Sequence, residues 1–135
     1  MALTKTLFEN ARVRVSDLRL PAQAATSFVH EFPTVRWQVD AGVHSLCGGG
    51  PVPVHDKAVT FMEAGTTWDC RNCGDSVYRQ VLFELKQPPR RTEAQVRELL
   101  ARARFSTDVG TALLFENRWC RVWDFYLEPG AGDPC

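Results

Sequence analysis

The sequence lacks any long apolar run. Its 135 residues contain no stretch close to the roughly 20 apolar residues that a membrane-spanning helix requires. The opening residues, MALTKTLFEN, also lack the apolar core that is typical of a secretory signal. We therefore expect no membrane segment and a cytoplasmic location.

The sequence also lacks a surplus of charge of either sign. Lys and Arg together number 16, as do Asp and Glu, so the formal net charge is zero. Proteins that bind nucleic acid or anionic lipid usually carry a basic surplus. The most basic stretch, residues 86–104, also contains Glu93 and Glu98, which is typical of a solvated helix face. We expect neither nucleic acid nor a membrane as a partner.

The number of cysteines is odd, so they cannot all pair within one chain. The five cysteines are Cys47, Cys70, Cys73, Cys120 and Cys135. Without a secretory signal they are typical of reduced thiols, not of a disulfide framework. Cys70 and Cys73 form a C-x-x-C motif, but a zinc site needs a second pair at a recognisable spacing. A redox pair needs a helix N-terminus that lowers a thiol pKa. We expect two free thiols between strands, with a redox or zinc role as the alternative.

What the sequence does contain is an internal repeat. Residues 7–20 recur as residues 114–127 at a constant offset of 107, and eight of these fourteen positions are identical. The second copy is followed by a Pro129-Gly130 turn and has room for one strand. We expect three parts: a β-barrel over residues 1–87, a linker with a helix over 88–110, and the first strand of a truncated second repeat over 111–135.

Between the two copies, short alternating segments predict strands. They cover residues 35–39, 57–62 and 77–86, with Gly or Pro between them, while residues 40–42 and 48–51 are typical of a turn and a loop. Thr92 followed by Gln95 predicts a capping box at the start of a helix over residues 93–104. The fold class predicted is all-β: a jelly-roll barrel with one connecting α-helix and an extra C-terminal strand.

Two segments resemble the cupin superfamily. Residues 7–18, which begin Leu-Phe-Glu-Asn, look like the opening strand of small single-barrel cupins. Residues 59–75 are similar to the second cupin motif, in which a Gly precedes a His by three residues and an Asn by seven. Gly65 and Asn72 stand at that spacing. The resemblance covers residues 7–86 and restarts at 114. It implies a cupin-like barrel that forms the first half of a two-barrel arrangement.

The resemblance also implies where a metal would bind, and the sequence departs from the family there. Cupins generally hold a divalent metal with a His-x-His and a Glu from the first motif and one more His from the second. Trp68 stands at the second-motif His position, and an indole N–H cannot ligate a metal. We therefore expect no metal cofactor and no catalytic residue.

The first motif can be aligned in two ways. One alignment places Val29 and Glu31 at the two His positions, with Thr34 near the Glu. A slip of one residue places Phe28 and His30 there instead. Either alignment keeps at most one metal ligand. His30 beside Glu31 is a surviving ligand or an acid–base pair in the alternative interpretation, which adjacent strand residues disfavour because they point to opposite faces.

Aromatic residues are the other candidates for the barrel interior. Trp37 alternates with Val35 and Val39, so we expect Trp37 and Trp68 to face inward and Arg36, Gln38 and Asp40 to face outward. The two indoles are either ordinary core residues or, with His30 and Glu31, the lining of a ligand pocket. His44 and His55 fall in turn or loop segments and are expected to be exposed.

These observations predict a non-catalytic binding or assembly module, with a small molecule in the barrel. The alternative is a metal-dependent cupin enzyme, of dioxygenase or isomerase type, with an atypical ligand set. Residues 113–127 carry too much apolar surface to stay in water as a single strand. We therefore also expect a homodimer whose interface includes Phe115, Trp123 and Phe125.

Overall fold

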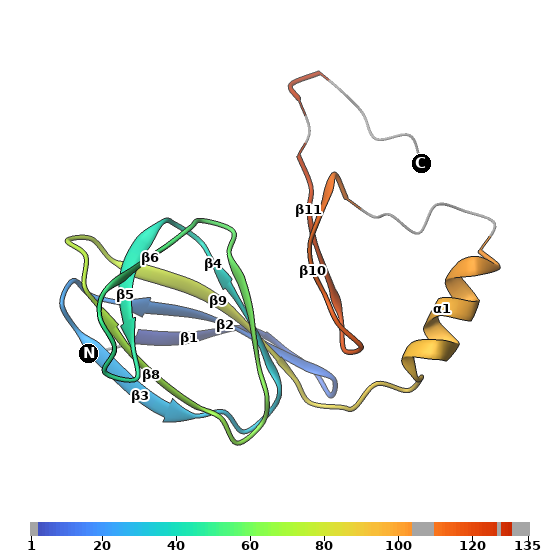
Figure 1. The fold of residues 1–135 in the computed structure, drawn as a ribbon, viewed down its shortest axis with the longest axis horizontal. Helices are drawn as coiled ribbons and strands as arrows, with labels where there is room; N and C mark the ends of the chain where they lie inside the picture. The colour runs from blue at the N-terminus through green and yellow to red at the C-terminus, as the bar shows by residue number, and fades with distance from the viewer. Residues whose placement is uncertain (1–2, 104–109, 127, 131–135) are drawn as a thin grey trace. The chain divides into compact units, whose positions relative to one another are not determined.

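The computed structural model describes residues 3–103, 110–126 and 128–130. The chain divides into two compact units, Met1–Gln87 and Pro88–Cys135, both shown in Figure 1. Among the described residues, no helix has the length and apolar character needed to cross a bilayer.

The first unit is a barrel of nine strands. Their bounds are β1 Leu3–Glu9, β2 Val13–Leu20, β3 Ala25–Val29, β4 Thr34–Gln38, β5 Gly42–Leu46, β6 Val52–Val54, β7 Val59–Met62, β8 Thr67–Asn72 and β9 Tyr78–Leu85. One sheet has the order β1-β2-β9-β4-β7 and the other the order β3-β8-β5-β6, with every pair antiparallel. The two sheets face each other across the interior (Figure 1). The all-β jelly-roll prediction is confirmed, although no strand was expected where β5 and β6 lie.

The core lies between the two sheets. In β8 the burial alternates strictly, so Trp68, Cys70 and Asn72 point inward while the residues between them are exposed. Trp68 and Cys70 pack with Leu20 and Tyr78 in one hydrophobic cluster. The inward side chains of β8 therefore form part of the barrel core.

The glycine and the asparagine of the second motif shape turns. Gly65 has a φ of 84°, a left-handed conformation that side-chain-bearing residues rarely adopt, and its N–H donates to the backbone oxygen of His30 at 2.8 Å. The buried Asn72 amide donates to the backbone oxygens of Leu20 at 2.9 Å and Ser76 at 2.8 Å. Both motif residues thus hold the barrel together, which explains their place in the pattern without any role in binding.

The opening segment is a hairpin, not the single strand expected over residues 7–20. Asn10 interrupts it, because its side-chain oxygen accepts hydrogen bonds from the N–H groups of Arg12 at 2.8 Å and Val13 at 2.9 Å. This asparagine turn reverses the chain and pairs β1 with β2, with one β-bulge between Thr6 and Phe8.

The second unit contains helix α1, Glu93–Ala101, and a hairpin of β10, Ala112–Glu116, and β11, Arg121–Asp124. The helix begins with the expected capping box of Thr92 and Gln95. The C-terminal repeat was expected to be one strand over 113–127, and this is wrong: Asn117 turns the chain there, and Leu127 lies outside the described residues. The extra C-terminal element is therefore a two-stranded hairpin.

Candidate functional site

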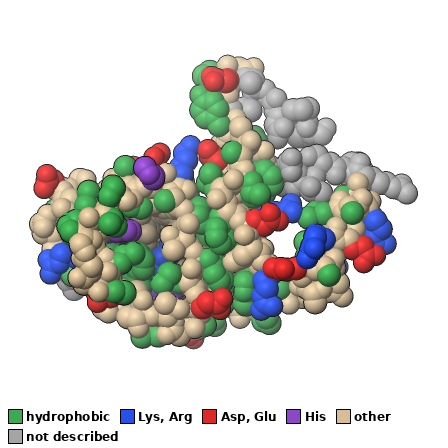
Figure 2. Space-filling view, viewed as in Figure 1, with side chains coloured by type: hydrophobic (Ala, Val, Ile, Leu, Met, Phe, Trp, Pro, Cys, Tyr) green, Lys and Arg blue, Asp and Glu red, His purple; other side chains and the backbone are tan. Residues whose placement is uncertain are grey.

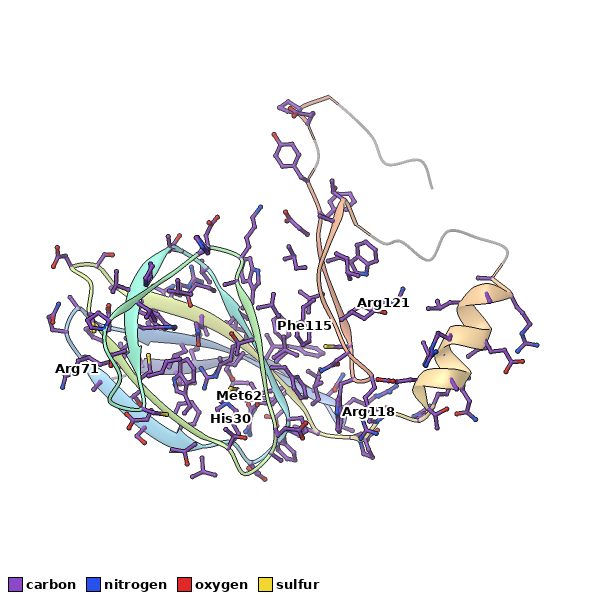
Figure 3. All side chains as sticks on the ribbon, viewed as in Figure 1. His30, Met62, Arg71, Phe115, Arg118 and Arg121 are labelled. Carbon is purple, nitrogen blue, oxygen red and sulfur yellow. The ribbon has the colours of Figure 1, made fainter. Side chains whose placement is uncertain are left out.

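The centre of the barrel is polar. Arg36, Gln38, Gln80 and His30 are all buried there, and the guanidinium-bearing residue Arg36 has no exposed surface at all. In Figure 3 the labelled His30 lies within the barrel, between the ribbons of its two sheets. Buried polar groups of this kind need hydrogen-bond partners, and most of these partners come from one another.

Arg36 is the hub of this cluster. Its Nε lies 3.2 Å from His30 Nε2 and its Nη1 donates to Gln80 Oε1 at 2.7 Å. The guanidinium carbon lies 3.7 Å from the centroid of the Trp68 ring and 5.2 Å from that of Phe28. Arg36 is thus enclosed by two aromatic rings and bound to two neutral polar groups.

A hydrogen-bonded chain continues from Gln80 toward the barrel wall. Gln80 Nε2 donates to Gln38 Oε1 and to the Tyr78 hydroxyl, both at 3.0 Å. The same hydroxyl lies 2.8 Å from His44 Nδ1. This chain joins the five-stranded sheet to β5 of the opposite sheet, so the cluster is held in one arrangement from both sides.

The titratable groups of the cluster are held in fixed protonation states at neutral pH. Burial, aided by the charge of Arg36, lowers the pKa of His30 to about 4, so this imidazole is neutral. Burial raises the pKa of Cys70 to about 11 and also raises the pKa of Tyr78. Burial lowers the pKa of Arg36 to about 10, which leaves the guanidinium charged at pH 7.

Three polar atoms of this cluster have no hydrogen-bond partner among the described residues. They are His30 Nδ1, Arg36 Nη2 and Trp68 Nε1. They belong to side chains that contact one another through Arg36, so the unused hydrogen-bonding capacity is gathered in one place.

Two pockets lie beside the cluster. The first has a volume of about 100 Å³, and the second about 190 Å³. The lining of the first includes Trp68, Gln80, Gln38, Val54, Leu46 and Met62. The lining of the second includes Phe28, His30, Thr34, Leu82, Arg14 and Glu84. Side chains that contact Arg36 line both pockets, while Arg36 itself lines neither.

These residues do not fit the metal that cupins generally hold. Among the described residues, no group of three or more His, Cys, Asp or Glu side chains could hold a metal ion. The Nε2 atom of His30 accepts a hydrogen bond from Arg36, and a buried guanidinium repels a cation. The protein therefore uses the centre of the barrel for an arginine cluster.

The structure brings together only some of the residues that sequence analysis selected for the interior. Trp68 lies there as expected, and His30 lies there as the one-residue slip of the first motif implies. Glu31 and Val29 are exposed, so the other alignment is wrong.

The placement of Trp37 was also wrong. Its strand presents Arg36 and Gln38 to the interior, and Trp37 pairs with Val81 and Val59 on the outer side of the sheet. That outer side is itself apolar, with Val35 next to Phe83 and Phe61. An alternating pattern shows which residues share a face, but here the apolar face is the outer one, so the usual assignment of sides fails.

Sequence analysis also missed three buried residues of the polar cluster, Arg36, Gln80 and Tyr78. It misplaced one histidine, His44. His44 lies in β5, is half-buried and contacts Tyr78, whereas exposure was expected. His55 is exposed as expected, and histidine side chains are visible on the face of the barrel unit shown in Figure 2. The alternation of Tyr78, Gln80 and Leu82 on one side of β9 was the signal that could have found two of these residues.

The C-x-x-C motif lies in and just after β8. Cys70 is buried in the core and Cys73 is half-buried, and both are free thiols, as are Cys47 and Cys120. Cys135 lies outside the described residues. Because burial raises the pKa of Cys70, its thiol is poorly suited to redox exchange.

No family model and no curated protein matches the sequence. Solved structures do match the fold. A cupin domain from Bordetella pertussis has a TM-score of 0.58 at 21% identity, covering 64% of this chain and 94% of its own. An RmlC-like cupin family protein with a double-stranded β-helix fold from Methanocaldococcus jannaschii has a TM-score of 0.52 at 8% identity, covering 63% of this chain and 80% of its own.

A third similar structure is the polyketide cyclase RemF from Streptomyces resistomycificus. Its TM-score is 0.53 at 13% identity, covering 65% of this chain and 67% of its own. Identities this low establish the fold and nothing finer. The chain has the cupin fold.

Proposed function

We propose that this cupin-fold chain is a non-catalytic module that binds a small molecule inside its barrel. The observation that carries the proposal is the buried cluster around Arg36, with unused hydrogen-bonding atoms on Arg36, His30 and Trp68 and two pockets beside it. Pockets with a few convergent polar groups and an apolar wall are typical of small-molecule sites.

The protonation states support binding over catalysis. A general acid or base works best with a pKa near the operating pH. The pKa of His30 is about 4 and that of Cys70 about 11, and the pKa of Tyr78 is raised further from neutrality. His30, Cys70 and Tyr78 are therefore not poised to exchange protons near pH 7. One similar structure is a polyketide cyclase, but at 13% identity its activity does not carry over.

The test combines metal analysis with ligand screening. The full chain, purified without a His-tag, is screened against a panel of neutral, anionic and cationic small molecules by thermal shift and tryptophan fluorescence. We expect compounds that raise the melting temperature of the wild type and change its fluorescence through Trp68. A Trp68→Phe variant should lose the fluorescence change, while the matched control Trp37→Phe, on the outer side of the sheet, should keep it. Stoichiometric metal lost on His30→Ala, or no compound that binds, would contradict the proposal.

A second function, assembly, is favoured by the C-terminal hairpin. It copies the first hairpin in sequence, turn and bulge, and its sheet has only two strands within the described residues. In the barrel, the corresponding strand β2 pairs with β9 along its whole length. We propose that the C-terminal hairpin pairs with the sheet of a second copy of the chain, with Phe115, Trp123 and Phe125 in the interface of a two-fold dimer.

A further inference from the structure

The charge of Arg36 is not balanced by the barrel itself. Its guanidinium hydrogen-bonds to His30 and Gln80, both neutral, and within the described residues no carboxylate lies at ion-pair distance. The acidic residue whose charge acts on Arg36 is Glu84, and Arg14 binds it at 2.5 and 2.7 Å. An unpaired buried charge is costly, so an anion that pairs with Arg36 would recover free energy on binding.

The unused atoms around Arg36 are all donors. Arg36 Nη2 and the indole Nε1 of Trp68 can only donate. The Nε2 atom of His30 accepts from Arg36, so the proton of this neutral imidazole lies on Nδ1, which is the third unused atom. Donors without an acceptor suit a group that only accepts hydrogen bonds, as an ionised oxyanion does. Of the three residues, Trp68 lines the first pocket and His30 the second.

The two pockets differ in their apolar lining more than in their charge. The second pocket is lined by Glu31 and by the ion pair of Arg14 with Glu84, so its lining carries one acidic residue more than it carries basic ones. The first has one acidic lining residue, Asp69, and its other lining residues are neutral. Asp69 belongs to the exposed side of β8, whereas Trp68 and Gln80 present the cluster to the pocket. The apolar side chains of the first pocket, among them Leu46, Val54 and Met62, suit a ligand with an apolar body. Trp68 and Gln80 give this pocket its contact with the cluster.

We propose that the barrel binds a small organic carboxylate with a short apolar body in the first pocket. Trp68, which lines this pocket, holds the ligand together with Arg36, which the carboxylate reaches by displacing the Gln80 oxygen. This inference rests on the proposed binding function and names its ligand class. Gln80 now accepts from Arg36 Nη1 at 2.7 Å, while Nη2 has no partner among the described residues. When the ligand enters, its carboxylate takes the place of the Gln80 oxygen and binds Nη1 and Nη2 as a bidentate pair. The pocket of about 100 Å³ limits the ligand to a few carbon atoms.

The test uses three probes of nearly equal shape: butyrate, butyramide and butylamine. Titration calorimetry of the full chain at pH 7, in a buffer without carboxylates, gives the affinity of each. We expect butyrate to bind at least about tenfold more tightly than butyramide, since a charged partner makes the stronger hydrogen bonds. Butylamine should show no binding, because its ammonium would lie beside a guanidinium.

Variants separate this inference from the function on which it rests. Arg36→Met should abolish the preference for butyrate, and Arg36→Lys, which keeps a charge but not the planar fork, should retain only part of it. Arg19→Met, which changes an exposed arginine on the outer side of the same sheet, is the control and should bind butyrate normally. Circular dichroism checks that each variant folds. If Arg36→Met does not fold, Arg36→Lys alone tests the role of Arg36.

Each outcome decides one claim. Equal binding of butyrate and butyramide, or a preference that survives in folded Arg36→Met and Arg36→Lys, would overturn the carboxylate inference and leave binding in the barrel standing. Failure of all three probes would also overturn it, and the broader compound panel would then decide the binding function separately.

Discussion

The first hairpin, residues 3–20, and the second, residues 112–124, differ mainly in whether a third strand pairs with them. In both, an asparagine oxygen accepts from two backbone N–H groups: Asn10 in the first and Asn117 in the second. The bulges lie at equivalent places, between Thr6 and Phe8 and between Leu113 and Phe115. Within the described parts of the chain, only the first hairpin has a further strand, β9, paired with its second strand.

The ion pairs show what the third strand changes. Arg121 of the second hairpin binds Glu116 across the hairpin at 2.7 Å. The corresponding Arg14 lies 3.9 Å from Glu9 and instead binds Glu84 of β9 at 2.5 Å. Local sequence thus specifies the hairpin, while its side chains take the partners that the neighbouring strand supplies. This comparison can be tested in four ways, from the largest expected effect to the smallest.

Removing the second hairpin should have the largest effect, on assembly. A chain ending at Gly110 keeps the barrel but loses β10 and β11. If the second hairpin pairs with a strand of another copy, light scattering should give a dimer for the full chain and a monomer for the shortened one. A monomeric full chain, or a shortened chain with the same oligomeric state, would show that the hairpin plays no part in assembly.

Truncating equivalent core and surface positions should have the next largest effect. Leu18 is fully buried between β1 and β9, and its equivalent in the second copy, Phe125, is 53% exposed. We expect Leu18→Ala to lower the free energy of unfolding by about 2–5 kcal/mol. Phe125→Ala should lower it by less than about 0.5 kcal/mol, because an exposed site loses little burial.

Urea denaturation at low protein concentration, where association is weak, measures both variants. Equal losses would mean that the second hairpin is as well supported as the first, and the comparison would then break down.

Acid should weaken the first hairpin through Asp17. Hydrogen bonds from Arg79 of β9 and from Arg19 hold the pKa of the nearly buried Asp17 carboxyl below its ordinary value. A lowered pKa in the folded state means that Asp17 stabilises the fold above its unfolded pKa of roughly 3.9. This contribution is lost as the pH falls through the folded value.

Asp17→Asn should therefore cost about 1–2 kcal/mol at pH 7 and progressively less below pH 4. Denaturation of both proteins between pH 7 and pH 2.5 measures this. Curves that stay parallel across that range would show that Asp17 and Arg79 form no stabilising pair.

Much of the fold could be predicted from the sequence, whereas the arginine cluster could not. Gly65, Asn72 and the repeated Leu-Phe-Glu-Asn carry local backbone geometry, which short segments specify by themselves, so turns and strands could be placed. The side of β4 that faces inward depends on its pairing with β9 and on an apolar outer face. Neither is visible in a single alternating segment. For that reason the sequence predicted Trp37 inside and Arg36 outside, the reverse of the structure.

The smallest expected difference between the two copies is that between their paired arginines. Arg14→Gln removes a bidentate partner from Glu84, whose side chain is 16% exposed, and leaves that carboxylate without its cation beside His30. We expect a cost of about 1–2 kcal/mol. Arg121→Gln removes a pair whose glutamate is 45% exposed, and this should cost less than about 0.5 kcal/mol. Both substitutions remove the charge and keep a polar side chain, so thermal unfolding at low and high salt isolates the electrostatic contribution. A larger loss for Arg121→Gln than for Arg14→Gln would mean that the second hairpin depends on its ion pair more than the barrel does. The third strand would then not explain the difference between the two copies.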